Sequence, residues 1–200
     1  MRSITQRFIV MTPLLLLLAG CGQTPVTPAG IDSANPQAPP PGTPAAQSPA
    51  ERGKVLVQVG GCNDCHTTKK NNEPDMSLML SGHPSSIKVP AAPKVPAGSP
   101  WIVQTTGTLT AWSGPWGISF AANLTPDPDT GLKSSAWSED AFLKAMKTGK
   151  HIGTGRDILP PMPWQMYSKL GDDDLKAIWA FLMTIPPVKN EVPDPIPPAK

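Results

Sequence analysis

The sequence predicts a mainly α-helical domain with long loops and a small β-hairpin insertion. Amphipathic segments with helix start signals begin near residues 48, 138 and 172, whereas strand-like segments gather between 101 and 124. The 27 prolines and 17 glycines among 200 residues indicate that much of the chain lies outside regular elements. This length suits one ordinary domain with tails, and we place the domain at residues 48–188.

The first predicted helix begins at Ser48, which can act as its N-cap. Pro49 takes the first helical position and Glu51 the third, as in a capping box. Residues 55–59 alternate in hydrophobicity and would also fit a strand. We predict a helix because the capping signal directly precedes them.

Two further helices are predicted in the second half of the chain. Ser138 precedes two acidic residues and an apolar stripe, which Gly149 ends. From Asp172 onwards, apolar residues recur at helical spacing until Pro186.

Residues 67–136 are predicted to be mostly loop. Segments 101–112 and 117–124 are rich in Thr, Ile, Val and aromatic residues, and Ser-Gly-Pro separates them. This pattern predicts a small hairpin inserted between the helical parts.

Residues 1–20 have the features of a lipoprotein signal peptide. Arg2 and Arg7 precede an apolar stretch, residues 8–18, that is too short to span a bilayer comfortably. The run Leu-Ala-Gly-Cys that follows resembles the lipobox of bacterial lipoproteins, in which the cysteine carries the lipids. We therefore expect Cys21 to anchor an exported protein to the membrane, with its domain facing the periplasm or the cell exterior. The alternative is ordinary cleavage that leaves Cys21 as a free thiol.

Proline-rich segments flank the domain on both sides. Residues 21–47 contain one charge and too little apolar surface to offset the entropy of ordering, so we predict a tether. Residues 189–200 are predicted to form a short flexible tail. Without Arg2 and Arg7, the 17 basic residues fall to the number of acidic ones, 15, which leaves no electrostatic case for nucleic acid.

The strongest motif is the run Cys-Asn-Asp-Cys-His at residues 62–66. In a C-x-x-C-H motif two thiols add across the vinyl groups of one haem, and the two-residue gap lets both sulfurs reach it from one helical turn. The imidazole that follows can then serve as the fifth ligand of the iron. We therefore predict one covalent haem c, attached through Cys62 and Cys65 and ligated by His66.

Three other interpretations of this run are weaker. A thioredoxin-like redox pair would need a βαβ context, which the predicted elements lack. A zinc site would need four convergent ligands, whereas two cysteines and three histidines are available besides Cys21, with Cys65 and His66 adjacent. The third interpretation is that the run matches the C-x-x-C-H motif by chance in an exported protein.

A second axial ligand should lie downstream of the motif. Met162 stands between prolines in the run Leu-Pro-Pro-Met-Pro-Trp, where it cannot lie inside a helix. A stiff loop of this kind would present the thioether to the iron, and Trp164 would shield the haem edge. Histidine and methionine together fill both axial positions, which favours electron transfer over catalysis at the metal. The rivals of Met162 are Met166, Met76 and Met79, with His83 and His151 as weaker alternatives.

Three separate runs carry a family resemblance. NLTPDPDTGLKSSAWSEDAFLKAMKTGKH, LPPMPW and LGDDDLKAIWAFLMTIPP resemble class I bacterial cytochromes c. The closest group includes small exported cytochromes and the cytochrome subunits of membrane-bound alcohol and sugar-acid dehydrogenases. The resemblance covers nearly all of residues 51–188 and implies a cytochrome c fold whose terminal helices cross beside the haem. It also implies Cys62 and Cys65 as thioether positions, His66 as proximal ligand and Met162 as distal ligand.

The resemblance has one departure, because those dehydrogenase subunits usually carry several C-x-x-C-H motifs and this chain has one. We expect a mono-haem electron carrier, not an enzyme, that shuttles electrons from a membrane or periplasmic dehydrogenase or quinol-oxidising complex to an oxidase or another cytochrome. Lys69 and Lys70 are the candidate docking patch, with solvated surface lysines as the alternative. A haem-based sensor of small ligands and a fixed cytochrome subunit of a dehydrogenase are the alternative functions. For the NLTPD segment around Asn123 and Thr125 we predict only a turn, which its proline favours.

Overall fold

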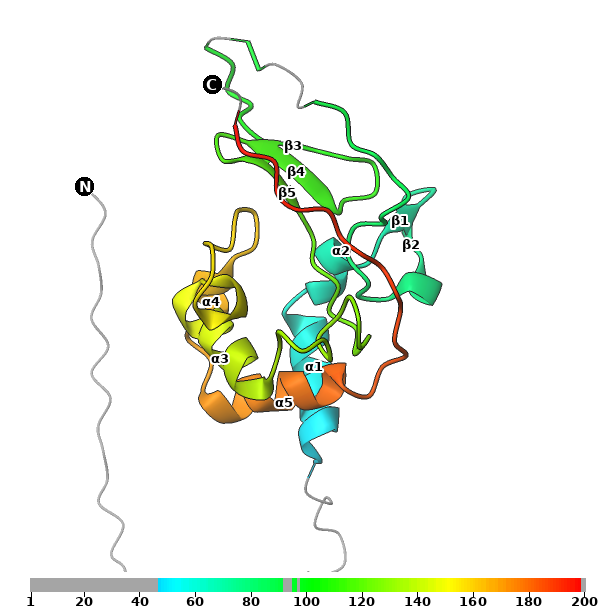
Figure 1. Cartoon of the computed structure of the whole chain (residues 1–200), viewed down its shortest axis with the longest axis vertical. Coiled ribbons are helices and arrows are strands. Elements are labelled where there is room, and N and C mark those ends of the chain that lie inside the picture. Colours follow the sequence, from blue (N-terminus) through cyan, green and yellow to red (C-terminus); the bar gives the residue numbers. More distant parts are fainter. Residues whose placement is uncertain (1–46, 92–94, 97, 199–200) are drawn as a thin grey trace, which may run out of the picture. The chain divides into compact units, whose positions relative to one another are not determined.

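The computed structural model describes residues 47–91, 95–96 and 98–198 (Figure 1). All of them belong to one compact unit, residues 45–200. The predicted signal peptide, Cys21 and nearly all of the predicted tether lie outside the described residues. Within the described ranges, no helix is long and apolar enough to cross a membrane.

Helix α1 (Pro49–Val59) begins where the capping signal predicts it. The Ser48 hydroxyl accepts a hydrogen bond from the Glu51 amide at 3.2 Å, and the Glu51 carboxylate accepts one from the Ser48 amide at 2.8 Å. The first bond gives the Glu51 amide an acceptor that the first turn of a helix does not itself supply. The second bond holds Ser48 in its capping position. The prediction of a helix here, against the strand alternative, is confirmed.

Helices α3 (Glu139–Thr148) and α5 (Asp172–Leu182) confirm the other two helix predictions. The Ser138 hydroxyl caps α3 by accepting from the Ala141 amide at 3.1 Å. Gly149 ends α3 in the left-handed conformation, with φ 70°. Helix α5 starts with three aspartates, which the positive end of the helix dipole favours. The shorter helical pieces are α2 (Cys62–His66), η1 (Met76–Leu78), η2 (His151–Gly153) and α4 (Trp164–Tyr167).

Helices α1 and α5 cross in close contact (Figure 1). Gly53 lies at this crossing, where an added Cβ atom would overlap the carbonyl group of Ala177. Glycine allows the two helix backbones to approach this closely. The main core surrounds this helix pair, and its buried members are Val57, Leu80, Leu132, Phe142, Leu175, Ile178, Leu182 and Ile185.

A three-stranded antiparallel sheet contains, in spatial order, β3 (Gln104–Thr105), β4 (Ala111–Gly114) and β5 (Gly117–Phe120). Strands β4 and β5 form a hairpin in which Ala111 lies opposite Phe120 and Gly114 opposite Gly117. The predicted hairpin is therefore confirmed, with strands shorter than the predicted segments.

A second, smaller pairing joins β1 (Lys69–Lys70) to β2 (Glu73–Pro74). The two residues between them, Asn71 and Asn72, both have positive φ, 53° and 67°. Asparagine tolerates this left-handed conformation better than most residues, and two such residues in a row suit a tight hairpin turn. The sequence predicts only loop at this position, so the pairing is an addition to the expected fold.

The chain stays packed beyond Val188, where the sequence predicts that the domain ends and a flexible tail begins. Ile196 pairs with Ile118 of β5 through two backbone hydrogen bonds of 2.8 and 2.9 Å. The side chain of Asn190 is almost fully buried, at 9% exposure for the residue. The packed region therefore extends at least to Ile196. The proline-rich composition of residues 189–200 does not reveal these contacts, because the residues that they contact lie in distant parts of the sequence.

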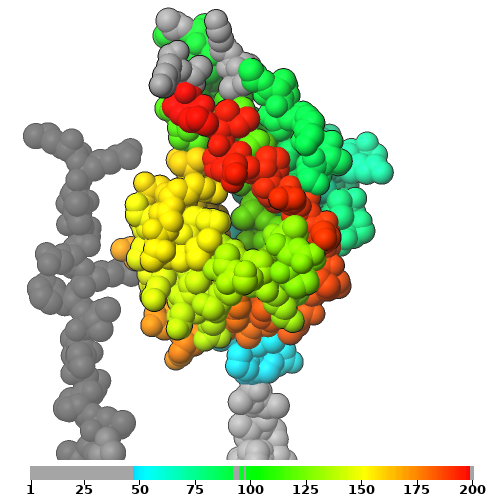
Figure 2. Space-filling model, viewed as in Figure 1, coloured from blue at the N-terminus to red at the C-terminus, as the bar shows by residue number. Residues whose placement is uncertain are grey.

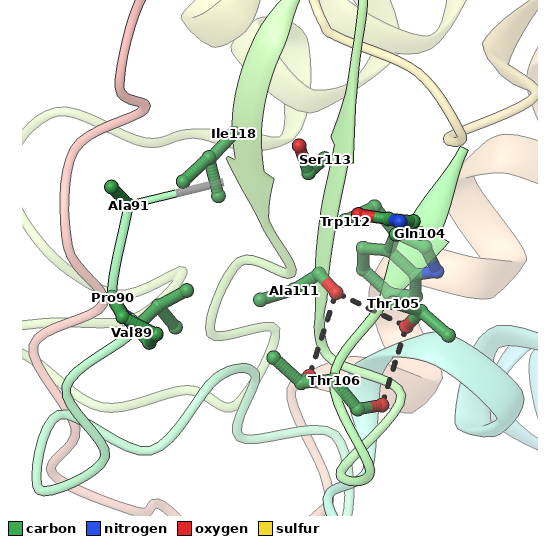
Figure 3. A pocket seen from close by; sticks show the side chains of 10 residues that line it. All are labelled: Val89, Pro90, Ala91, Gln104, Thr105, Thr106, Ala111, Trp112, Ser113 and Ile118. Carbon is green, nitrogen blue, oxygen red and sulfur yellow. Dashed lines mark hydrogen bonds between the residues drawn. The ribbon is translucent and has the colours of Figure 1, made fainter. Parts of the chain in front are cut away.

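A small pocket of about 140 Å³ lies beside the sheet (Figure 3). Its lining comes from residues 89–91 and from residues of β3, β4 and β5 and the turn before β4. It is smaller than the roughly 300 Å³ at which sites for drug-sized ligands begin. None of its lining residues belongs to α2, so it is separate from the predicted cofactor site.

Candidate haem-binding site

The run at residues 62–66 forms helix α2 directly after the end of α1. Gly61 makes the sharp change of direction between the two helices with φ 67°, a left-handed conformation that favours glycine. Cys62 and Cys65 lie three residues apart on α2, so their side chains share one face of the helical turn. Both are free thiols and both are partly buried. The structure thus brings the two sulfurs and His66 together on one short helix.

Burial sets the protonation state of the two thiols. It raises the pKa of Cys62 to about 11 and also raises the pKa of Cys65. Tyr167, which packs beside Gly60, donates to the Gly60 carbonyl at 2.5 Å, and burial raises the pKa of its phenol to about 12. Because the pKa values of both cysteines are raised, both thiols are protonated at neutral pH.

The surroundings of the two thiols offer a zinc ion too few ligands, because a structural zinc site needs four. Among the described residues, no group of three or more His, Cys, Asp or Glu side chains could hold a metal ion by itself.

His66 is 9% exposed, and its ring orientation is set by a backbone group. Its Nδ1 donates a hydrogen bond to the Ala122 carbonyl at 2.8 Å, because a carbonyl can only accept. Burial lowers the pKa of the imidazole, although the bond to Ala122 opposes this. The ring is therefore neutral at pH 7 with its proton on Nδ1. Nε2, which makes no hydrogen bond in the described part of the chain, keeps its lone pair for a metal.

Met162 lies between η2 and α4, on a segment without regular structure, and its side chain is partly buried. Hydrogen bonds tie this segment to two elements: the Ile158 amide donates to the Gly149 carbonyl at 2.7 Å, and the Ser119 hydroxyl donates to the Pro160 carbonyl at 2.6 Å. Trp164 packs its indole against Gly149, at the end of α3. Figure 2 shows the surface hollowed between the yellow segment around residue 150 and the green and red segments.

The methionine rivals of Met162 differ from it in exposure. Met166 lies on α4 and is 72% exposed, and Met76 lies in η1 and is 58% exposed. An exposed thioether on a surface helix is poorly placed to ligate a buried group. Met79 is partly buried and packs against the main core.

The two histidine rivals differ in their surroundings. His83 is fully buried, its Nε2 donates to the Ile87 carbonyl at 3.1 Å, and its Nδ1 accepts from the Thr110 hydroxyl at 2.9 Å. Because one ring nitrogen carries the proton and the lone pair of the other accepts a hydrogen bond, His83 has no free lone pair for iron. The His151 ring packs edge-on against Trp137, with ring centroids 5.3 Å apart.

Sequence reasoning missed the Ala122 carbonyl, which orients His66 from 56 residues away. A backbone acceptor has no residue signature, and the only signal near it is the NLTPD segment that begins at the next residue. The candidate docking residues Lys69 and Lys70 form β1, where Lys70 is exposed and Lys69 partly buried.

Comparison with known proteins finds subunits of dehydrogenases among the relatives of this chain. No family model matches the chain. The chain is 30% identical over 169 residues to a subunit of the nicotinate dehydrogenase of Pseudomonas putida, and this match spans 84% of the chain and 10% of that protein. It is 28% identical over 147 residues to the cytochrome c subunit of the quinone-dependent alcohol dehydrogenase of Gluconobacter oxydans, 72% of this chain and 23% of the relative. The gluconate 2-dehydrogenase cytochrome c subunit of Pantoea cypripedii is 28% identical over 133 residues, 66% of this chain and 22% of the relative.

The chain thus spans between a tenth and a quarter of the length of these relatives. Its homologues include cytochrome c subunits of dehydrogenases, which are c-type cytochromes. The expected relation to such subunits is confirmed at this level. The cofactor that their names imply is haem c.

The residues of α2 fit such a group. Covalent attachment needs two free thiols one helical turn apart, and ligation needs a neutral imidazole with a free nitrogen. Cys62, Cys65 and His66 meet these requirements in their spacing, burial and hydrogen bonding. A thioether such as that of Met162 is the soft donor that completes axial ligation in cytochromes c.

Proposed function

We propose that this chain is a mono-haem c-type cytochrome that carries electrons. The observation that supports this most directly is the state of His66, which follows the two thiols, is held by the Ala122 carbonyl through Nδ1 and keeps Nε2 free. When bound here, haem c supplies one-electron redox chemistry. Cys62 and Cys65 would hold it through thioether bonds, and His66 and Met162 would ligate its iron.

Two protein ligands would make the site a carrier and not a catalyst. With His66 and Met162 both bound to it, the iron would have no position left for a substrate or a gas. The hydrogen bond to Ala122 holds the imidazole in one tautomer and one orientation, so little rearrangement of this side chain would be needed on a change of iron charge. Trp164, packed against Gly149, would close the site to solvent near Met162.

We propose further that residues 1–20 direct export and that Cys21 carries lipids, which would tether the domain to a membrane on its periplasmic or outer side. The donor would be a dehydrogenase or a quinol-oxidising complex, and the acceptor an oxidase or another cytochrome. A second candidate is a fixed cytochrome subunit of a dehydrogenase complex. The names of the relatives, which are subunits, favour this second candidate.

Visible spectra of the full chain, matured with haem c, test the carrier function. Reduction should give the sharp bands of a low-spin haem, and carbon monoxide should leave them unchanged on the timescale of mixing. Fast binding of carbon monoxide by the native protein would contradict the proposal and favour the ligand sensor. Recovery of the chain with a dehydrogenase after detergent solubilisation would favour the fixed subunit over the shuttle.

Covalent attachment is tested by replacing the two cysteines of α2 together. The variant Cys62→Ala/Cys65→Ala should lose all haem on denaturation, because no thioether can form, whereas wild type should retain the mass of one haem. Mass spectrometry of the denatured chains measures this. The matched control is Cys21→Ser, at the only other cysteine, which should retain the haem mass. Retention of haem mass by the double variant would contradict the assignment.

A further inference from the structure

The polar side chains that directly follow Ala122 are buried and mutually bonded. Asn123 is 5% exposed and Thr125 is fully buried. The Asn123 side-chain oxygen accepts from the Thr125 amide at 3.0 Å and from the Thr125 hydroxyl at 2.7 Å. The Asn123 side-chain nitrogen donates to the Val188 carbonyl at 2.8 Å, and the Val188 amide donates to the Thr125 hydroxyl at 3.1 Å. The NLTPD turn thus holds the C-terminal segment at Val188.

Asn190, two residues further along, binds a second segment, residues 81–85. Its side-chain nitrogen donates to the Ser81 carbonyl at 2.7 Å and to the His83 carbonyl at 2.9 Å. Its side-chain oxygen accepts from the Ser85 amide at 2.9 Å. A buried amide with all these partners is costly to disturb, because each partner would lose its hydrogen bond without gaining water. We use the term asparagine clamp for Asn123 together with residues 188–190, which include Asn190. Through these residues the clamp joins the segment around Asn123 to the segment that Asn190 binds.

The two segments that the clamp joins are the segments that hold His66. The Gly82 amide donates to the His66 carbonyl at 2.8 Å, and the Ala122 carbonyl accepts from His66 Nδ1, also at 2.8 Å. The segments also touch each other, since the His83 amide donates to the Ala121 carbonyl at 3.0 Å. Gly82 packs so tightly that an added Cβ atom would stand 2.5 Å from the Ala121 oxygen and 2.7 Å from the Ala122 oxygen.

We propose that the asparagine clamp positions the Ala122 carbonyl against His66, so that the C-terminal segment controls the hydrogen bond of the candidate iron ligand. Asn123 and Asn190 are positioning residues, because they act through the backbone of residues 81–85 and 121–125 and do not reach the imidazole by any hydrogen bond. This gives the NLTPD segment a function and makes residues 188–190 part of the site. The inference rests on the proposed function because its test is carried out on the haem-loaded protein.

The test is the variant Asn190→Ala in the full, haem-loaded chain. Loosening the clamp should weaken the bond from His66 Nδ1 to Ala122. The Nδ1 proton, followed by NMR in the reduced protein, should then exchange with solvent on the order of tenfold faster, the factor for a bond weakened by about 1.4 kcal/mol. The reduction potential should rise, because an imidazole with a weaker Nδ1 hydrogen bond is a weaker donor to ferric iron.

A second variant guards against loss of folding. Thr130→Val removes only a hydroxyl, which accepts from the Asn190 amide at 3.0 Å and from the Asn123 side chain at 3.2 Å. It should shift proton exchange and potential in the same direction by smaller amounts. The matched control is Lys189→Ala, which removes an exposed ion pair with Asp129 from the same segment and should change neither quantity.

The outcomes separate this inference from the proposed function. A wild-type chain that binds no haem would overturn the proposed function itself. A haem-loaded Asn190→Ala or Thr130→Val protein that is less stable but has unchanged Nδ1 exchange and potential would overturn the clamp, and would leave those residues with a purely structural role.

Discussion

Replacing Met162 with alanine is expected to abolish the sulfur-to-iron charge-transfer band of the oxidised protein. The reduction potential should fall by about 0.1 V or more, within the span of about 0.8 V over which axial ligands set haem potentials. A thioether stabilises ferrous iron relative to ferric iron, so water or a weak substitute in its place favours the ferric form. Near-infrared absorption and a spectroelectrochemical titration measure the two effects.

Our proposal of Met162 is supported by how its segment is held. The segment is tied to Gly149 at one point and to Ser119 at another, which restricts where the thioether can lie. Met166 differs in its exposure, since its residue is 72% exposed on α4. Met166→Ala is therefore the matched control and should keep both the band and the potential. If Met166→Ala removes the band and Met162→Ala keeps it, the assignment of Met162 is wrong.

Replacing Gly53 with alanine is expected to destabilise the domain by about 3 kcal/mol, at the upper end of the usual cost of overpacking. The added methyl group would overlap the Ala177 carbonyl, which is backbone and cannot rotate away. Helices α1 and α5 would have to separate, and the core residues between them would lose contacts. The better helix propensity of alanine recovers only about 1 kcal/mol. Urea unfolding of the haem-loaded protein, followed by far-ultraviolet circular dichroism, measures the loss.

The control for this prediction is Gly107→Ala. Gly107 is exposed, has nothing within 4 Å of the added Cβ atom and needs no left-handed φ. The substitution should change the free energy of unfolding by no more than about 0.5 kcal/mol. Equal stability of the two variants would show that the helix crossing is not as close as the structure has it.

Much of the local structure could be predicted because its signals lie within a few residues of each other. The capping box of Ser48 and Glu51 resolves an ambiguous segment as helix α1, and Gly149 marks the end of α3. The turn between β4 and β5 could be predicted for the same reason. The short β1–β2 pairing was missed, because the paired residues themselves are two lysines, a glutamate and a proline, which are types depleted in strands.

By itself the sequence determined the chemistry of the candidate site: two thiols one helical turn apart, a histidine that follows them and a methionine enclosed by prolines. It also determined where the three main helices begin, since a cap acts on its own first turn. Only the tertiary structure decided which carbonyl orients His66, that both ring nitrogens of His83 are hydrogen-bonded, and that the chain stays packed to Ile196. Those outcomes depend on hydrogen bonds between residues far apart in the chain, often to backbone atoms that every residue has. Such partners leave no trace in a residue pattern, and they become visible only once the chain is folded.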